Sequence, residues 1–391
     1  MTQSQEKSLV AESRALFQQA FQQPARVCVT APGRVNLMGG HVDYNEGFVL
    51  PAAIDKSIAV CASPRDDRQL AMVSADYRDQ IQVPLSALAF SKEHFWSNYV
   101  QGVAFFLQQQ GHPLRGANLL IKGNIPPGAG LSSSAALEVA AGYAFKALNH
   151  LSISELEMVK LCRKVENDFV GVQCGIMDQL ISAVGKKNHA LLLDCRSLDY
   201  EYIPVPRHAS LLICDTGLKR ELAGSEYNRR RQACQATVDR LSKVLPGIRT
   251  LRDVTPGQLE AHAHLLDETL RKRSRHVVTE VQRTKESAAL LRKGDLAAFG
   301  SLMFQSHLSL KNDYEVSCPE LDTIVDLCAQ CDGVYGARLT GAGFGGSVVC
   351  LAQDDCCPRV LDRLSNQYGR LTHRSVTLCI CNIASGVAMF D

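Results

Sequence analysis

Residues 125–140, IPPGAGLSSSAALEVA, constrain the fold more than any other stretch of this 391-residue chain. Two prolines end a strand here, Gly128 and Gly130 allow backbone conformations closed to residues with a Cβ, and Ser132–Ser134 open a helix. The first amides of a helix lack intrahelical partners, and the positive end of the helix dipole lies at the same place. The segment therefore predicts a loop that binds an anion such as phosphate.

An ordinary serine-rich helix cap after a proline turn is the alternative for this segment. The segment differs from two common nucleotide-binding motifs. It is not a Walker loop, because no Gly-Lys-Ser/Thr follows, and it is not the dinucleotide-binding motif, because its glycines are not at Gly-x-Gly-x-x-Gly spacing. The candidate ATP-binding residues are Pro127, Gly128, Ala129, Gly130, Leu131, Ser132, Ser133 and Ser134.

Two other glycine-rich segments contain residues that are typical of turns. Residues 37–48, LMGGHVDYNEGF, place a histidine and an aspartate directly after a pair of glycines, as a loop that binds a small molecule would. Residues 339–346, LTGAGFGG, lie between two strand-like runs, where a tight turn without any ligand is the alternative.

Hydrophobic periodicity divides the chain into two lobes. Residues 5–22 have helical spacing, and strand-like segments such as FVLPAAID, SIAVCASP and ANLLIKGNI then alternate with helices as far as about residue 205. The following part is mainly helical and charged until strands return around the last glycine-rich loop. We find no internal repeat and no low-complexity linker. The pattern predicts an α+β protein with lobes 1–205 and 206–391.

Composition limits the partners of the chain. Lys and Arg total 42 against 40 Asp and Glu, a formal net charge of +2, and no block of like charge favours a nucleic acid or a membrane surface. The N-terminus lacks a basic start followed by an apolar run, and no stretch approaches 18 uninterrupted apolar residues, the length of a membrane span. We therefore expect a cytoplasmic protein, a monomer or weak dimer, whose partner is a small molecule.

The fifteen cysteines are expected to be reduced, because their number is odd and most lie in apolar strand-like runs. Cys328 and Cys331 form a C-x-x-C, but a zinc site needs a second pair at matching spacing. Cys328 instead belongs to the helical pattern of PELDTIVDLCAQ, and Cys379 and Cys381 alternate as in a strand. We do not expect zinc.

Taken together, the three glycine-rich segments resemble the three motifs of the GHMP family of small-molecule kinases. APGRVNLMGGHVDYNEGFVLPAAID looks like the galactokinase signature within that family. The likeness covers nearly the full chain, since CGIMDQLISAVGKKNHALLLDCRSL, KRELAGSEYNRRRQ and RHVVTE also match galactokinase segments in order. The resemblance implies a two-lobed GHMP kinase fold with the active site in the cleft between lobes. It leaves open whether the last strand crosses back to the first lobe.

The reaction implied is transfer of the γ-phosphate of ATP to the anomeric hydroxyl of galactose, giving galactose 1-phosphate and ADP. Such a transfer needs a held nucleophile, a metal on the phosphates and positive charge where negative charge gathers. Asp178 matches the catalytic base, and Arg34 matches the arginine that keeps this carboxylate ionised. Ser133 and Glu166 match the hydroxyl and carboxylate on Mg²⁺, although three adjacent serines leave a one-residue shift open. Read alone, Asp178 fits a helix cap and Glu166 a solvated helix face.

The sugar-binding residues implied by the resemblance include one departure from its pattern. Galactokinases usually have Gly-Glu-His where this chain has Gly40 before His41, and that glutamate holds the primary hydroxyl at carbon six. A hydrogen bond to a charged group is worth about 1.5–3 kcal/mol, so selection at carbon six is expected to weaken by roughly ten- to a hundredfold, with catalysis kept, unless another side chain or water replaces the glutamate. The alternative is that Gly40 is a neutral variant and the enzyme still phosphorylates galactose. The sugar residues are Arg34, Gly40, His41, Asp43, Gly175, Asp178 and Tyr227, with Gly341, Gly343 and Gly345 near the phosphates or the sugar.

Other functions remain open at this point. One is a GHMP kinase for galacturonate, arabinose, fucose or N-acetylgalactosamine, which Gly40 would distinguish. Another is a non-catalytic sugar sensor, a class that loses residues in the phosphate loop, whereas GLSSSAA, Arg34 and Asp178 are all present here. A structural protein would bind neither nucleotide nor sugar. Ala342 replaces a glycine common in the family, which is tolerable at negative φ.

Overall fold

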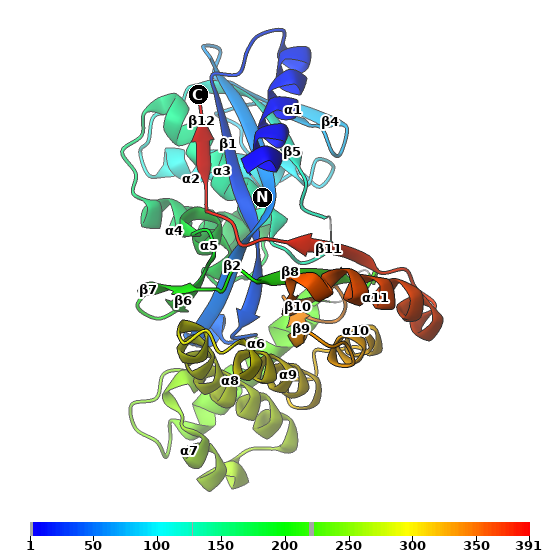
Figure 1. Ribbon diagram of the computed structural model, residues 1–391. Coiled ribbons are helices and arrows are strands. Elements are labelled where there is room, and N and C mark those ends of the chain that lie inside the picture. The colour runs from blue at the N-terminus through cyan, green and yellow to red at the C-terminus, as the bar shows by residue number, and fades with distance from the viewer. Residues whose placement is uncertain (1–2, 127, 219–222) are drawn as a thin grey trace.

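A long antiparallel hairpin runs through the middle of the protein (Figure 1). Its strands, β1 (Val27–Met38) and β2 (Phe48–Arg65), are buried over almost their whole length, as their runs of valine, alanine and isoleucine favour. The computed structural model describes residues 3–126, 128–218 and 223–391. Because β2 has 18 residues, its first end pairs with β6 while its other end pairs with β5.

Eight strands form the sheet built on this hairpin. Their order is β12-β1-β2-β5-β3-β4, with β6 on the end of β2 and β7 on β6. The β3–β5 pair is parallel and the other pairs are antiparallel. The added strands are β3 (Gln69–Ser74), β4 (Asp79–Pro84), β5 (Gly116–Gly123), β6 (His189–Asp194), β7 (Tyr200–Pro204) and β12 (Ala388–Phe390).

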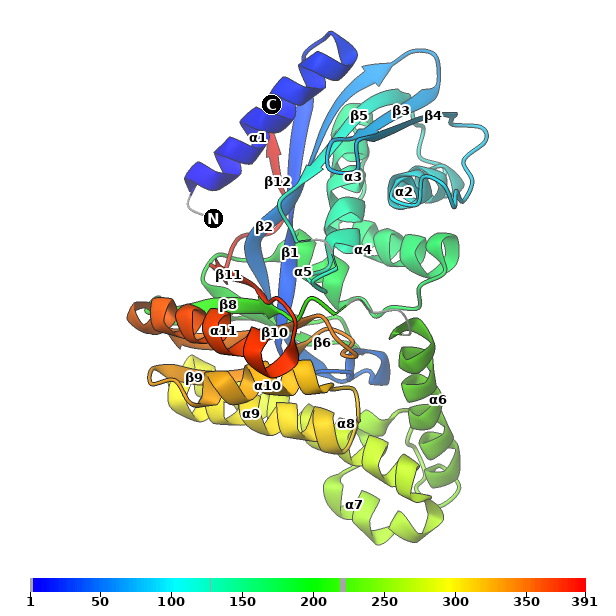
Figure 2. The same cartoon turned by 90° about the vertical axis from the view of Figure 1, so that its right-hand side faces the viewer.

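Helices cover both faces of this sheet (Figure 2). Helix α1 (Gln3–Phe21) lies on one face, where Phe17 packs against Cys28 and Cys61 in an apolar cluster of its own. The opposite face carries α3 (Ser133–Asn149), which contacts β1 and β2 along its length. Around α3 lie α2 (Ser97–Gln109), α4 (Glu155–Lys164) and α5 (Met177–Val184).

The second lobe has a smaller antiparallel sheet, ordered β11-β8-β10-β9, with helices against it. Its strands are β8 (Ala209–Asp215), β9 (Val334–Thr340), β10 (Ser347–Gln353) and β11 (Thr377–Cys381). Its helices are α6 (Ala223–Leu241), α7 (Pro256–Ala261), α8 (Glu268–Arg292), α9 (Leu296–Asn312), α10 (Pro319–Ala329) and α11 (Cys357–Thr372). No helix among the described residues is both long and apolar enough to cross a membrane.

The two lobes are tied together at several points. The hairpin tip enters the second lobe, where the Gly39 amide donates to Glu280 on α8 at 3.0 Å. From the second lobe, Ser347 Oγ on β10 donates to the carbonyl of Ala129, which lies in the serine-rich loop of the first lobe, at 2.6 Å. After β11 the chain returns to the first sheet, where β12 pairs with β1, so both termini lie in the first lobe (Figure 1).

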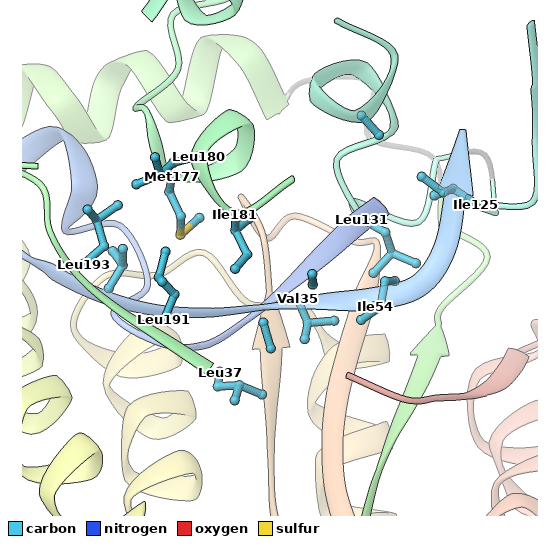
Figure 3. Close-up of a cluster of buried hydrophobic side chains, with 14 of the residues drawn as sticks. Val35, Leu37, Ile54, Ile125, Leu131, Met177, Leu180, Ile181, Leu191 and Leu193 are labelled. Atoms are coloured by element: carbon cyan, nitrogen blue, oxygen red, sulfur yellow. The ribbon is translucent and has the colours of Figure 1, made fainter. Parts of the chain in front are cut away.

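An apolar cluster under the hairpin fixes the position of its polar residues (Figure 3). Val35 and Leu37 of β1 gather there with Ile54 of β2 and Ile181 of α5. Successive residues of a strand point to opposite faces, so Arg34 and its neighbour Asn36 face away from this cluster. Burial of the apolar residues therefore directs Arg34 toward the cavity between the lobes.

Candidate active site

A cavity of about 600 Å³ lies where the hairpin tip meets both lobes. Of the predicted residues that the structure describes, Ala129, Gly343 and Gly345 lie outside its lining, and Pro127 falls outside the described residues. The predicted residues in the lining are Arg34, Gly40, His41, Asp43, Gly128, Gly130, Leu131, Ser132, Ser133, Ser134, Glu166, Gly175, Asp178, Tyr227 and Gly341.

Arg34 and Asp178 form a bidentate ion pair in this cavity. Arg34 Nε donates to Asp178 Oδ1 at 2.8 Å and Nη2 to Oδ2 at 2.7 Å, across 144 positions of sequence. Both side chains are largely buried, at 7% and 23% exposure, so the pair is shielded from water. The planar fork fixes both carboxylate oxygens, which a lysine could not do. Arg34 Nη1 also donates to the Gly130 carbonyl at 2.8 Å, so the guanidinium links the carboxylate to the serine-rich loop.

The serine-rich loop has the geometry expected of an anion-binding loop. Gly128 and Gly130 have φ values of 77° and 73°, and Ser132, at the start of α3, has φ 60°. A non-glycine residue at positive φ is strained and persists only where its surroundings hold it. Ser132 Oγ donates to Asp178 Oδ2 at 2.5 Å instead of capping α3. The start of α3, whose first amides have no partner within the helix, therefore lines the cavity beside the Arg34–Asp178 pair.

The hydroxyl that lies against Glu166 belongs to Ser134, one position beyond Ser133, the residue predicted to bind Mg²⁺. Ser134 Oγ donates to Glu166 Oε1 at 2.9 Å, whereas Ser133 is exposed. The reason is local: Ser133 and Ser134 are consecutive in α3, so their side chains point about 100° apart. Glu166 itself lies in a π-helical segment, Val165–Val170, a rare conformation that is frequent at functional sites.

Glu166 is a buried carboxylate held by three donors. Gln179 Nε2 and Cys174 Sγ donate to its Oε2 at 2.7 and 3.3 Å, and Ser134 to its Oε1. Burial, followed by the charge of Asp178, raises the pKa of Glu166. The described residues contain no cluster of three or more His, Cys, Asp or Glu that could hold a metal. One carboxylate and one hydroxyl fit Mg²⁺, which takes most of its ligands from phosphate and water.

A second buried acid, Glu138, lies behind Glu166. Gln179 Nε2 also reaches Glu138 Oε2 at 3.2 Å, so one amide group joins the two carboxyls. Burial, with the nearby charge of Glu166, raises the pKa of Glu138 well above its ordinary value, which favours the neutral carboxyl. Sequence analysis missed Glu138 and Gln179, although both lie within segments that carry predicted residues.

Asp43 lies in the cavity wall against Gly175. A Cβ at Gly175 would be 2.0 Å from Asp43 Oδ2, so glycine is required for the carboxylate to occupy this place. Burial, followed by the charge of Asp178, raises the pKa of Asp43 to about 6. Ionised above that pH, Asp43 can accept hydrogen bonds from two neighbouring hydroxyls.

His41, predicted to bind the sugar, lines the cavity and also contacts the last glycine-rich loop. Its Nδ1 lies 3.0 Å from Tyr44 Oη and its Nε2 lies 3.1 Å from the Ala342 carbonyl, so both nitrogens already have protein partners. Burial and the charge of His276 lower the pKa of His41 to about 3, which makes the ring neutral. His41 therefore joins the hairpin tip to the last glycine-rich loop.

Some of the remaining predicted residues line the cavity, and the others pack outside it. Tyr227 of α6 lines the cavity with its ring centroid 5.6 Å from that of His41. In the last glycine-rich loop, Gly341 lines the cavity with φ 81°, and the adjacent Ala342 is not among the positive-φ residues. Gly343 and Gly345 lie outside the cavity lining and pack closely against other backbone atoms. A Cβ built on Gly343 would lie 2.2 Å from the Val316 carbonyl oxygen, and one built on Gly345 would lie 3.0 Å from the Leu218 carbonyl oxygen.

A buried charged group under the hairpin tip was also missed. Glu280 on α8 accepts the amides of Gly39 and Gly40 at 3.0 and 3.2 Å. Burial opposes the charge of Glu280, but Arg338, His276 and Arg283 outweigh it and lower its pKa to about 2. His276 Nε2 lies 3.0 Å from the Gly40 carbonyl. The only sequence signal was RHVVTE, which carries His276 and Glu280 at helical spacing.

A serine-rich loop at a helix start, beside an Asp–Arg ion pair in a cavity between two lobes, defines a small-molecule kinase of the GHMP class. Three family models match the chain: the galactokinase galactose-binding signature over residues 15–64, the GHMP kinases N terminal domain over 98–186 and the GHMP kinases C terminal model over 287–369. A Methanococcus jannaschii mevalonate kinase, 18% identical over 92% of this chain and 98% of its own with a TM-score of 0.63, shares the fold.

Galactokinases are far more similar. The galactokinases of Roseiflexus sp. (strain RS-1) and Chloroflexus aurantiacus are 48% and 45% identical, each match covering 96% of both chains. The crystal structure of Lactococcus lactis galactokinase complexed with galactose is 36% identical, covers 97% of this chain and 99% of its own, and has a TM-score of 0.93. The chain belongs to the galactokinase family of GHMP kinases.

Proposed function

We propose that the protein transfers the γ-phosphate of ATP to the anomeric hydroxyl of galactose, giving galactose 1-phosphate and ADP. The observation that carries this proposal is the bidentate Arg34–Asp178 pair, which lies between the serine-rich loop and Asp43 in one cavity. The galactokinase relatives, whose matches cover 96% of the chain, are the reason for naming galactose as the sugar. ATP and the sugar are the partners of this site.

In this mechanism Asp178 holds the anomeric hydroxyl and accepts its proton at Oδ1 or Oδ2 as the oxygen attacks phosphorus. Phosphoryl transfer leaves little covalent chemistry to the protein, so holding the two reactants in line is its main contribution. Arg34 keeps the carboxylate in place and lies beside the Gly130 carbonyl, where the transferred phosphoryl group would gather negative charge. The free amides at the start of α3 bind the phosphates of ATP.

Mg²⁺ would be held by Ser134 and Glu166, together with phosphate oxygens and water. When bound, it neutralises charge on the phosphates of ATP. Gln179 orients Glu166 from behind, because its amide donates to the oxygen opposite the one that Ser134 contacts. At the sugar end, Asp43 accepts from neighbouring hydroxyls and fixes the ring so that its anomeric hydroxyl meets Asp178.

The test is ADP release, coupled to a detectable reaction, with ATP, Mg²⁺ and a panel of galactose, glucose, arabinose, fucose and N-acetylgalactosamine. We expect galactose to lead by at least an order of magnitude, and phosphorus NMR to place the phosphate on carbon one. ADP release that no sugar stimulates, from a folded enzyme, would overturn the proposal.

We also place the enzyme in the cytoplasm, where ATP is available and its fifteen free thiols stay reduced. We expect a monomer or a weak dimer, since each chain contributes a complete cavity. Light scattering coupled to size exclusion measures this directly.

A further inference from the structure

Residues 171–175 form a loop in the wall of the cavity. All five line the cavity, and they connect the π-helical segment Val165–Val170 to α5. Gly171 turns the chain out of the π-helical segment with φ 90°, and a Cβ built on it would meet nothing within 4 Å. The next residue, Val172, is 48% exposed. Packing therefore does little to fix the first half of this loop.

Hydrogen bonds to two adjacent residues, Glu166 and Asn167, hold the loop instead. The amide of Val172 donates to the Glu166 carbonyl at 2.8 Å. The Cys174 amide donates to Asn167 Oδ1 at 2.8 Å, and Gln173 Nε2 donates to the Asn167 carbonyl at 3.1 Å. Within the described part of the chain, the hydrogen bonds that the loop donates all go to these two residues.

The side chain of Asn167 acts on the loop from behind the cavity wall. Consecutive residues of a helix point in different directions, so Glu166 lines the cavity while Asn167 does not. Asn167 Oδ1 accepts from both the amide and, at 3.4 Å, the Sγ of Cys174. A backbone amide without a partner is unfavourable unless water reaches it. Loss of this oxygen would therefore favour movement of the loop toward solvent.

The end of the loop that Asn167 holds contacts two acids of the site. Gly175 directly follows Cys174, and it lies so close to Asp43 that a Cβ on Gly175 would be 2.0 Å from Oδ2. Cys174 Sγ donates to Glu166 Oε2 at 3.3 Å, but two other side chains donate to Glu166 at 2.7 and 2.9 Å. The place of Asp43 therefore depends on the loop more than the place of Glu166 does.

We propose that Asn167 is a positioning residue for the sugar: it keeps residues 171–175 closed against Asp43 and thereby sets the affinity of the site for galactose. The ion pair at the reacting centre has contacts of its own with the serine-rich loop, so its geometry is kept when residues 171–175 move. Asn167 thus acts on sugar binding and not on phosphoryl transfer. This inference rests on the proposed function, in which Asp43 accepts hydrogen bonds from the sugar.

The experiment compares four variants with the wild type by steady-state kinetics, galactose calorimetry and hydrogen exchange. Asn167→Leu and Asn167→Ala remove the acceptor, the first at similar volume, whereas Asn167→Asp keeps an oxygen at the same position. Asp168→Leu is the matched control, because Asp168 is exposed and is the next residue of the same segment. Hydrogen exchange of the peptide that spans residues 171–175, measured by mass spectrometry, reports on the loop without turnover.

We expect Asn167→Leu to raise both the KM and the Kd for galactose by about tenfold and to speed exchange of the loop. Its kcat and its Mg²⁺ requirement should stay within about twofold of the wild type, as expected when only binding is lost. Asn167→Asp should restore most of the affinity and the slow exchange, and Asp168→Leu should match the wild type. Asn167→Ala decides the question if thermal melting finds Asn167→Leu unfolded.

Unchanged galactose affinity in the folded variants that lack the acceptor overturns the inference, and so does a loss confined to kcat or shared equally by Asp168→Leu. A wild type that binds galactose but phosphorylates no sugar would overturn the proposed function alone, since affinity and hydrogen exchange still test Asn167. A wild type that does not bind galactose would overturn both.

Discussion

Ser132 Oγ lies 2.5 Å from Asp178 Oδ2, so the residue at the start of α3, the helix that we propose binds phosphate, also holds the carboxylate that we propose as the base. The serine-rich loop and Asp178 are thus directly hydrogen-bonded, although 46 positions separate Ser132 and Asp178 in sequence. This contact, together with the bidentate Arg34 pair, explains how proton acceptor and phosphate can be kept in line without a covalent intermediate.

Asp178→Asn should lower kcat by at least about a hundredfold, the scale of a general base, because an amide cannot accept the proton. ATP affinity, measured by calorimetry, and the melting temperature should change little, since Asn retains a hydrogen bond from Ser132 or Arg34. Near-wild-type turnover in this variant would remove Asp178 from the role of base.

Arg34→Lys should lose less activity than Arg34→Ala, because lysine keeps the charge but not the planar fork that holds both oxygens of Asp178. We expect a loss of about tenfold or more in kcat for lysine and a further loss for alanine. Steady-state kinetics at saturating galactose and ATP measures both. Equal kcat in the wild type and both variants would place Arg34 away from the reacting atoms.

Ser134→Ala should raise the Mg²⁺ concentration needed for half-maximal activity by about tenfold, because it removes the hydroxyl that lies against Glu166. Ser133→Ala is the matched control, since its side chain is the same size and is exposed one position earlier in α3. Mg²⁺ titration at fixed ATP compares the two. A larger effect of Ser133→Ala than of Ser134→Ala would show that Ser133, the residue first predicted, is the Mg²⁺ ligand.

Gln179→Leu should also raise the Mg²⁺ requirement, because it deprives Glu166 of its 2.7 Å donor. Glu138→Gln should behave almost as wild type, since glutamine mimics a neutral carboxyl, whereas Glu138→Leu should resemble Gln179→Leu. The measurement is Mg²⁺ titration with melting curves for each variant. If Glu138→Gln proves as damaging as Glu138→Leu, Glu138 acts as a charged group.

The KM for galactose should rise as pH falls through about 6, the pKa of Asp43. Burial and the charge of Asp178 raise this pKa, so the carboxyl is ionised and accepts from the sugar above pH 6, and it takes up a proton below. Asp43→Asn should have a higher KM that no longer changes in this range, which separates Asp43 from the titration of ATP. A KM that stays constant in the wild type from pH 7 to pH 5 would contradict the assignment.

The elements of the fold could largely be predicted from sequence, because helices and strands depend on short-range periodicity. The helical spacing of residues 5–22 corresponds to α1, and ANLLIKGNI corresponds to β5. FVLPAAID and SIAVCASP merge into the single strand β2, since the lysine between them is tolerated at a partly buried position of a strand paired on both sides. The return of β12 to β1 was left open, because a three-residue strand carries almost no periodic signal.

The sequence by itself determined the chemistry of the site: the glycines and serines at the start of α3, the arginine on β1 and the acids at Asp178 and Glu166. The loop at the start of α3 follows from residue type and local spacing, and Arg34, Asp178 and Glu166 follow from the resemblance to GHMP kinases; the chain carries both signals without folding. Only the tertiary structure decided that Ser134 and not Ser133 contacts Glu166, that both nitrogens of His41 are already bonded, and that Arg338 fills the space at Gly40. These depend on side-chain direction and on contacts between segments up to about three hundred residues apart. Packing of the two lobes, and no local pattern, brings such residues together.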